Sequence, residues 1–220
     1  MQVFEEARHL RGRPMLLSSA LPTFAPPSEA KQPAVPKFPD VFTASRFIVE
    51  QGGAVRQPGW ERHDYNVGLH STARVAPYAG RMDETLIVGK SPDDATAYTV
   101  WRDATNYSEK SCELFSQGGA IQPQALLDAS SAVYRGATQV PMGATPGSNV
   151  TADWWHGQYN SPMGPHEADL YVSPTDNTQV YKIVHTGVDL ALEFPLADWD
   201  ATQSKVVVPD DCPKPSFPQP

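Results

Sequence analysis

The sequence has few cysteines, few charged residues and no long apolar run, and each shortage excludes a class of protein. No stretch approaches the about 18 consecutive apolar residues that a membrane-spanning helix needs. The formal net charge of −8 argues against nucleic acids and anionic membrane surfaces as partners. Charged residues make up 19% of the chain and hydrophobic residues 40%, which is typical of a globular protein and not of a disordered one.

Catalytic motifs are missing too. The sequence has no GxSxG elbow, phosphate-binding loop, dinucleotide-binding glycine turn or Cys–His pair in a recognisable context. Nothing marks neighbouring acids such as Asp83 and Glu84 as a matched acid–base pair. We therefore expect a protein that is not an enzyme and has no catalytic residues.

Histidines are the residues that first suggest a metal site, but their spacing does not support one. Residues 63–76 alternate in polarity, so we interpret them as one long strand, on which His63 and His70 have opposite parity and face opposite sides of a sheet. No HExxH or similar ligand spacing is present. The sequence therefore predicts solvated strand histidines and no metal site.

Proline is abundant, and its distribution divides the chain. Of 22 prolines, seven lie in residues 1–40 and five in the last twelve residues. Proline fixes φ and removes a backbone donor, so neither end is expected to form a regular helix or a central strand. We predict an extended arm over residues 1–40, a globular body over 41–208 and a second arm over 209–220.

The body reads as a series of short strands separated by turns. One short helix is predicted at Gln122–Ser131, where Pro123 occupies a first-turn position. The pattern predicts a mostly β protein with two curved antiparallel sheets, as a half-barrel or sandwich. Besides residues 63–76, the predicted strands are Thr85–Val88, Thr96–Trp101, Val133–Val140, Val150–Trp155, Ala168–Ser173, Gln179–His185 and Asp189–Phe194.

Aromatic side chains in or beside these strands are the main chemical resource of the body. Trp154 and Trp155 are adjacent in a predicted strand, so they point to opposite faces of the sheet. If the sheets curve, aromatic and apolar side chains line a pocket, whereas in a flat sandwich they fill a solid core. The candidate pocket residues are Phe47, Tyr65, Leu69, Tyr98, Trp101, Trp154, Tyr181 and Leu192.

The order of features over residues 38–212 resembles the ependymin-related family, whose fold is similar to that of the bacterial lipoprotein carriers LolA and LolB. The features that carry this resemblance are a strand at Phe42–Glu50 after a proline-rich lead-in, the segment Asn149-Val-Thr-Ala-Asp-Trp-Trp155 and the closing Val206-Val-Val-Pro-Asp-Asp-Cys212. Between them lie Trp60, the His63-Asp-Tyr65 strand, an Ala97-Tyr-Thr-Val100 strand and Cys112 before the Pro123 segment.

The resemblance implies two facing sheets around an apolar pocket for a lipid-like ligand, often in a homodimer, with calcium or a bound lipid as the associated small group. It also bears on the two cysteines, Cys112 and Cys212, which by themselves are either free thiols or a pair. The family resemblance implies that they form a disulfide. Such a bridge, closing about 100 residues, would stabilise the fold by up to about 4.7 kcal/mol in the chain-entropy model.

Two glycosylation sequons bear on the compartment, Asn106-Tyr-Ser108 and Asn149-Val-Thr151. Together with the cysteines they favour a secreted protein or one in the lumen of an organelle, where conditions are oxidising. The first ten residues, MQVFEEARHL, have no apolar core, so they predict neither a signal peptide nor a transit peptide. Either the protein never leaves its compartment of synthesis or the chain is the processed form, and a secreted or lumenal protein corresponds to the second.

Two functions fit these observations. The first is a non-enzymatic, ependymin-like binding protein with an apolar pocket for a lipid or another hydrophobic molecule. The second is an accessory or structural subunit of a larger assembly, in an organelle lumen or outside the cell, which docks on other subunits through its proline-rich arms.

Overall fold

The computed structural model describes residues 32–50, 56–76, 80–91, 93–118, 121–143, 147–162, 164–187 and 190–214. Gln32–Pro220 form one compact unit, distinct from Met1–Lys31. Residues 32–40, assigned to the arm in the sequence, are therefore part of the body's unit, and the remainder of the predicted N-terminal arm lies outside the described residues.

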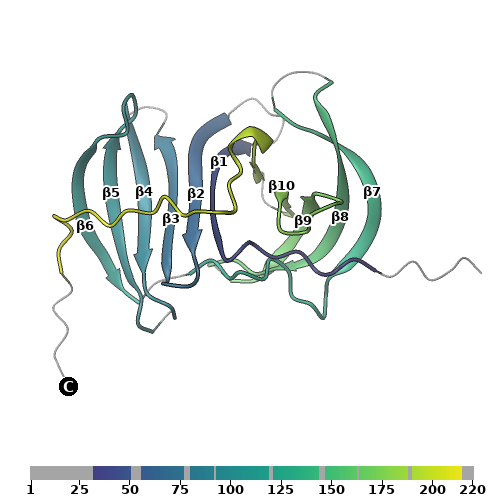
Figure 1. The fold of residues 1–220 in the computed structure, drawn as a ribbon, viewed down its shortest axis with the longest axis horizontal. Helices are drawn as coiled ribbons and strands as arrows, with labels where there is room; N and C mark the ends of the chain where they lie inside the picture. Colours follow the sequence, from purple (N-terminus) through teal and green to yellow (C-terminus); the bar gives the residue numbers. More distant parts are fainter. Residues whose placement is uncertain are drawn as a thin grey trace, which may run out of the picture. The chain divides into compact units, whose positions relative to one another are not determined.

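A single antiparallel sheet dominates this unit, in the strand order β6-β5-β4-β3-β2-β1-β11-β10-β9-β8-β7 (Figure 1). The mostly β prediction is confirmed, and the strands that we divided between two sheets are continuous across the β1–β11 pair. The strands are β1 (Val41–Glu50), β2 (Arg56–Asp64), β3 (Leu69–Ala76), β4 (Arg81–Val88), β5 (Thr96–Asp103), β6 (Glu109–Gln117), β7 (Val133–Pro141), β8 (Asn149–Tyr159), β9 (His166–Val172), β10 (Val180–His185) and β11 (Leu190–Glu193).

The sheet is open, and both of its edge strands carry β-bulges. In β6, Lys110 and Phe115 have no partner residue in β5, because the register shifts on either side of them. In β7 the same is true of Arg135 opposite β8. A bulge leaves one residue unpaired and increases the local twist of the strand.

The two faces of the sheet have different coverings. On the inner face, strands β7–β11 curve around a core that contains Trp155 of β8. Phe38, Phe42 and Leu126 join this core from other parts of the chain. Trp155 is fully buried, whereas Trp154 lies on the other face and is half-buried, which confirms that the two side chains point in opposite directions. Burial of these large side chains is the main source of stability in this half.

Two connecting segments close the inner core in place of the predicted helix. Phe38 N–H donates to the Gln124 carbonyl at 2.8 Å, and isolated bridges join Lys37 to Ala125 and Leu127 to Tyr159. The prediction of a helix at Gln122–Ser131 was wrong, because this segment is extended up to the turn at Asp128–Ser131. Within the described residues, the one short helical element is a 3-10 turn at Leu196–Asp198.

The opposite face of β1–β6 is crossed by residues 199–212, which we call the C-terminal strap (Figure 1, yellow). Near the start of the strap, Asp200 forms two backbone hydrogen bonds of 2.8 Å with Thr43. The strap then passes over a cross-strand row on this face, where Val206 and Cys212 pack against a buried cluster. The row consists of Ser45, Trp60, Ala73, Glu84, Val100 and Cys112.

Candidate binding cavity

A cavity of about 480 Å³ lies between β1, β2 and the first part of the strap. Its volume falls within the range of about 300–1,000 Å³ that is usual for small-molecule sites. Apolar parts of its wall come from Phe47, Trp60, Met82 and Trp199. The cavity is thus on the strap face and not in the concave inner face, which the core fills.

Tyr107 forms one end of this cavity and is held there by an unusual backbone conformation. It is the one non-glycine residue with positive φ (59°) in the described part of the chain. The left-handed conformation costs about 1 kcal/mol for such a residue. Asp103 offsets this cost, because its carbonyl accepts the Tyr107 N–H at 2.9 Å and its carboxylate accepts the Thr105 N–H at 2.8 Å. The turn places the Tyr107 ring edge-on to Trp60, with centroids 5.8 Å apart.

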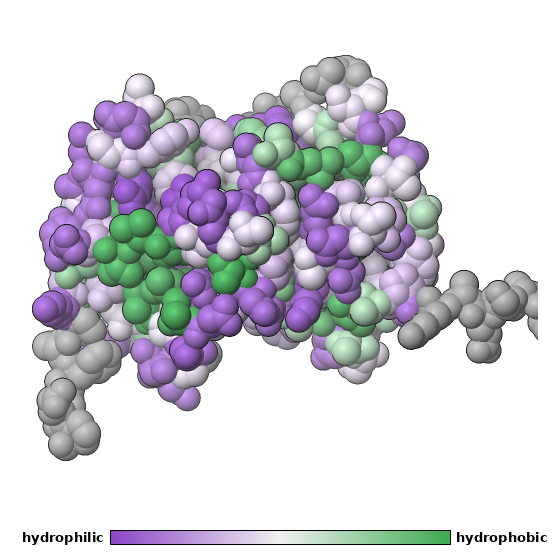
Figure 2. Space-filling view, viewed as in Figure 1, coloured by the Kyte–Doolittle hydropathy of each residue, from purple (hydrophilic) through white to green (hydrophobic). Residues whose placement is uncertain are grey.

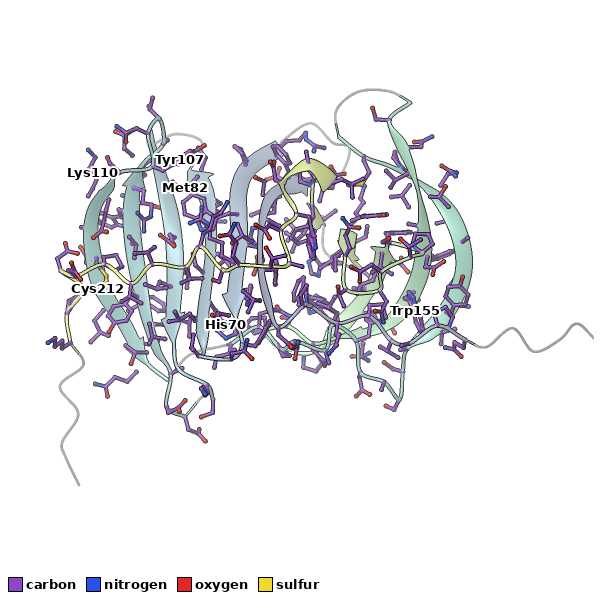
Figure 3. All side chains as sticks on the ribbon, viewed as in Figure 1. His70, Met82, Tyr107, Lys110, Trp155 and Cys212 are labelled. Atoms are coloured by element: carbon purple, nitrogen blue, oxygen red, sulfur yellow. A yellow bond between two sulfur atoms is a disulfide. The ribbon has the colours of Figure 1, made fainter. Side chains whose placement is uncertain are left out.

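Figure 3 shows Tyr107 and Met82 at the same end of the β1–β6 half, and Cys212 at the far end of the strap. The cavity and the disulfide therefore lie at separate places along the strap. Met82 is almost completely buried and packs with Trp60 and Ala73 under the cavity. The floor of the cavity is well packed and rigid in consequence.

Arg62 supplies the distinctive charge of the site. Its guanidinium carbon lies 4.1 Å from the centre of the Trp60 ring, in a cation–π contact. Among the described residues no carboxylate lies within ion-pair distance of it, and its buried Nε has no hydrogen-bond partner. Burial lowers the pKa of Arg62, and the Arg102 charge lowers it further, while Glu84 opposes both. The guanidinium is nevertheless charged at every physiological pH.

Other charges at the cavity are either exposed or already engaged. Lys205 adds a second, exposed cation from the strap, and its carbonyl accepts a long hydrogen bond of 3.4 Å from Arg62. Asp200 accepts hydrogen bonds from the Thr202 N–H and hydroxyl and from Gln203, which holds the pKa of its carboxyl at about 2. Asp198 is exposed in the 3-10 turn. Arg46 is paired with Glu61, and its Nε and the Trp199 indole nitrogen are, like Arg62 Nε, buried without a hydrogen-bond partner. Arg62 differs from the other cations at the cavity because it is half-buried and has no acid partner among the described residues.

A buried network of hydrogen bonds and one ion pair holds the Trp60 side chain in place. The Trp60 indole N–H donates to Ser71 Oγ at 3.0 Å, and the Ser71 hydroxyl donates to Glu84, which also pairs with Arg102. Glu84 is 2% exposed, so each of these partners is needed to offset the cost of burying its charge. The network thus fixes the orientation of the Trp60 indole, which makes the cation–π contact with Arg62.

The residues predicted to line a pocket do not converge on one cavity. Only Phe47 among them lines the cavity described above. Tyr65 and Leu192 pack against the inner core, Tyr98 lies in the cluster under the strap, and Tyr181 lies in a small cluster with Val140 and Ala152.

The last three predicted pocket residues are also elsewhere. The Trp154 indole donates to Asp169 at 2.9 Å on the outer surface of the curved half. The Trp101 ring is covered by the Arg81 guanidinium at 4.5 Å, and Leu69 is paired with Asp64 at the start of β3. The alternation of side chains along a strand correctly predicted that Trp154 and Trp155 point to opposite faces. The tryptophan that points into the core is, however, Trp155 and not Trp154.

The sequence interpretation missed Arg62, Met82, Tyr107, Trp199 and Lys205 as cavity residues. One signal was available, because Trp60 and Arg62 are two residues apart in a strand and so share a face. Trp199 and Lys205 could not be found in this way, since they belong to an irregular segment whose path depends on the whole fold.

His63 and His70 do not face opposite sides of the sheet, and that prediction was wrong. A turn at Tyr65–Gly68 divides the supposed single strand, so the two histidines are direct cross-strand neighbours in β2 and β3. Their Nδ1 atoms are 2.8 Å apart, and His63 Nε2 is in contact with the Glu61 carboxylate. Burial lowers the pKa of His70 to about 3, with a further lowering by His63.

A second imidazole pair lies elsewhere on the inner face. His166 Nε2 and His185 Nδ1 are 2.6 Å apart, and both rings contact Tyr159. Burial, followed by the effect of His166, lowers the pKa of His185 to about 4. In the described residues no group of three or more His, Cys, Asp or Glu side chains is arranged to hold a metal ion.

The disulfide between Cys112 and Cys212 is present, with their Cα atoms 4.9 Å apart. It joins the end of the strap to the edge strand β6. Both sequon asparagines, Asn106 and Asn149, are exposed and in turn or strand-end positions, which is where a glycan is accommodated. In the part of the chain that the structure describes, no helix is both long and apolar enough to cross a membrane.

Comparison of the chain with family models finds no match, and the curated proteins contain none similar to it.

Proposed function

We propose that this protein is a non-enzymatic binding protein that holds a small amphipathic molecule, with an apolar body and one anionic group, in the strap cavity. This keeps the binding function that the resemblance to ependymin-related proteins led us to expect, but moves the site from the concave face to the strap face. The observation that carries the proposal is Arg62, a cation at a cavity of about 480 Å³ without an acid partner among the described residues.

Physical complementarity supports this ligand class. Phe47, Trp60 and Met82 offer apolar surface, whose burial by a ligand is favourable. Arg62 offers a guanidinium charge without an acid partner to a carboxylate or another planar anion, and a charge-assisted hydrogen bond of this kind contributes about 1.5–3 kcal/mol. We also propose an oxidising compartment, since the Cys112–Cys212 disulfide would persist there.

The proposed role of Arg62 predicts a selective loss of affinity. The Arg62→Gln variant is expected to bind decanoate at least tenfold more weakly than the wild type, and decanol with unchanged affinity, because only the anion uses the guanidinium. Isothermal titration calorimetry measures both. Arg74→Gln is the matched control, since Arg74 is exposed on the neighbouring strand β3 and belongs to a different cross-strand row.

A cavity-filling variant tests the location. Ser45→Trp puts a large side chain at a half-buried position that lines the cavity, and it should abolish the binding of both probes. Acetate, which lacks the apolar body, should not bind measurably to the wild type. Equal binding of decanoate to the wild type and to Ser45→Trp would show that the ligand is held somewhere else.

The alternative function, an accessory subunit docked through its proline-rich arms, remains a prediction. The described parts of the arms are engaged within the chain itself: Phe38 is in the inner core, and Cys212 packs against the buried cluster of Leu86, Tyr98 and Val100. These contacts already offset the loss of chain entropy on ordering those parts, so their order requires no partner subunit.

A further inference from the structure

We infer that the Cys112–Cys212 disulfide is a redox latch that keeps the strap closed over the cavity, so that its reduction releases the strap and the ligand beneath it. This inference rests on the proposed function for its second half, the release of the ligand. Its first half concerns the strap alone and stands on the contacts of the strap with the sheet.

The two ends of the strap are anchored by different means. At the first end, the backbone pairing between Asp200 and Thr43 and the packing of Trp199 on Phe42, with ring centroids 5.1 Å apart, do not involve the disulfide. At the other end, Cys212 is joined covalently to β6. Reduction therefore frees one end and leaves the other attached, as a hinged cover requires.

Between these ends the strap is weakly attached. Within the described residues, its middle makes no backbone ladder with the sheet. The polar contacts of this part with the sheet are a hydrogen bond from Lys205 N–H to Thr43 Oγ1 at 3.0 Å and the long bond from Arg62 to the Lys205 carbonyl. Val207 is 65% exposed and Val208 38% exposed. Few buried contacts and few protected hydrogen bonds mark a segment that opens at low free-energy cost.

Between Lys205 and the disulfide, two apolar residues resist opening through their burial. Val206 packs against the cluster of Leu86, Tyr98 and Val100, and Pro209 is buried. Figure 2 shows the apolar surface of this region on the β4–β6 side of the strap face. Burial of one valine and one proline offsets only part of the entropy cost of ordering the strap, so the covalent bond supplies the rest.

A like-charge contact next to the bond favours opening once the bond is broken. The carboxyl of Glu109 on β6 is hydrogen-bonded to that of Asp211, and burial together with Asp211 raises the pKa of Glu109 to about 7. Arg102 partly counteracts this, while Glu84 adds to it. Loss of the Glu109 proton above that pH removes the hydrogen bond to Asp211, which favours separation of the strap end from β6 once the disulfide is broken.

Opening removes a specific wall of the cavity. The Lys205 side of the cavity belongs to the free part of the strap, whereas Trp199 and Asp200 belong to the anchored part. On release, Arg62 also loses its contact with the Lys205 carbonyl and becomes exposed to water, which weakens its attraction for an anion. A bound ligand is therefore expected to dissociate faster.

The chemistry of the latch is thiol–disulfide exchange with a dithiol. The thiolate of the reductant attacks Sγ of Cys212, the less buried of the two cysteines, forming a mixed disulfide and releasing the Cys112 thiolate. The second thiol of the reductant then displaces Cys212. The products are two cysteine thiols and the oxidised dithiol, with two electrons transferred.

Limited proteolysis of the full chain tests the latch. Thermolysin, which cleaves before apolar residues and has no disulfide of its own, is expected to cut at Val206–Val208 at least tenfold faster after dithiothreitol treatment. Cleavage before Ile183, a fully buried residue of β10, is the internal control and should not change. Reoxidation should restore slow cleavage, and Cys112→Ser/Cys212→Ser should behave like the reduced protein without any reductant.

The outcomes separate the latch from the binding function. Unchanged cleavage at Val206–Val208 on reduction overturns the latch, and so does a parallel rise at Ile183, because the bond would then hold the fold and not the strap. At pH 8, Glu109→Gln should slow the cleavage of the reduced protein, since the repulsion from Asp211 is gone. Decanoate should dissociate severalfold faster from the reduced form. If it binds neither form, the proposed function fails, whereas the latch is still decided by the cleavage rates.

Discussion

In a Glu109→Gln background, lowering the pH from 6.5 to 4.5 is expected to reduce the free energy of unfolding by about 3 kcal/mol. The loss comes from His70 and His185, whose pKa values in the folded protein are lowered to about 3 and about 4 from the ordinary value of 6.5. Each pH unit between the unfolded-state and folded-state pKa values corresponds to about 1.4 kcal/mol of stability for each histidine. We reduce the sum of the two contributions because solvent partly screens these charges.

The direction follows from proton binding in the two states. Between pH 6.5 and the folded-state values, the unfolded chain binds protons at both histidines while the folded protein leaves them neutral. The stabilisation is therefore fully present above pH 6.5 and is lost as the pH falls. The geometry gives the same answer, because two ring nitrogens at 2.8 Å or 2.6 Å can share one proton but cannot both carry one.

Glu109 is removed from the background because it acts in the opposite direction. Its folded-state pKa is raised to about 7 from 4.5, so over this range the folded protein binds the proton and gains stability as the pH falls. The wild type should consequently show a shallower loss than Glu109→Gln. Urea denaturation at several pH values, followed by circular dichroism, measures both slopes.

Replacing the histidines provides the control. His70→Asn and His185→Asn keep a side-chain donor close to the position of Nδ1 but do not titrate. The double variant in the Glu109→Gln background should lose less than 1 kcal/mol between pH 6.5 and 4.5. A loss as large as that of the parent would assign the pH dependence to other groups.

Phe42→Ala is expected to lower the free energy of unfolding by about 3–5 kcal/mol, the usual cost of deleting a fully buried aromatic ring. Phe42 is 0% exposed and stacks against Phe38 at 4.7 Å, His63 at 5.0 Å and Trp199 at 5.1 Å. These rings come from the segment before β1, from β2 and from the start of the strap, so the cavity left by the truncation cannot easily collapse.

Phe115→Ala is the matched control for that variant. Phe115 is 75% exposed at a bulge on β6, and its removal should change stability by less than about 0.5 kcal/mol. Chemical denaturation of the two variants side by side gives the comparison. Similar losses for both would contradict the position of Phe42 at the centre of the inner core.

The sequence predicted strand content well because period-two alternation reflects a local property, the burial of one face. It failed at residues 63–76 because the same alternation runs through the turn Tyr65–Gly68. A signal for that turn was present: Asp64 accepts the Asn66 N–H at 3.1 Å, and Gly68 adopts φ of 73°, as residues of these types often do in turns. Recognising it would have brought His63 and His70 to the same face.

The helix at Gln122–Ser131 and the cavity could not be inferred locally. The apolar residues Leu126 and Leu127 suit a short helix, but their burial in the inner core and the pairing of Leu127 with Tyr159 favour an extended chain. The disulfide was predicted correctly through the family resemblance. The cavity depends on the path of the strap, which is fixed only when Cys212 meets β6.

The bulges at Lys110, Phe115 and Arg135 have a consequence for how copies of this chain meet at high concentration. An open sheet with two regular edges would act as a template for further strands, and would grow end to end. Here the edge of β6 is interrupted at two positions only five residues apart in numbering, and that of β7 is interrupted near its start. Neither edge offers a row of backbone donors and acceptors that is uninterrupted over its whole length, so a concentrated preparation should keep the chains separate and not join them into fibres.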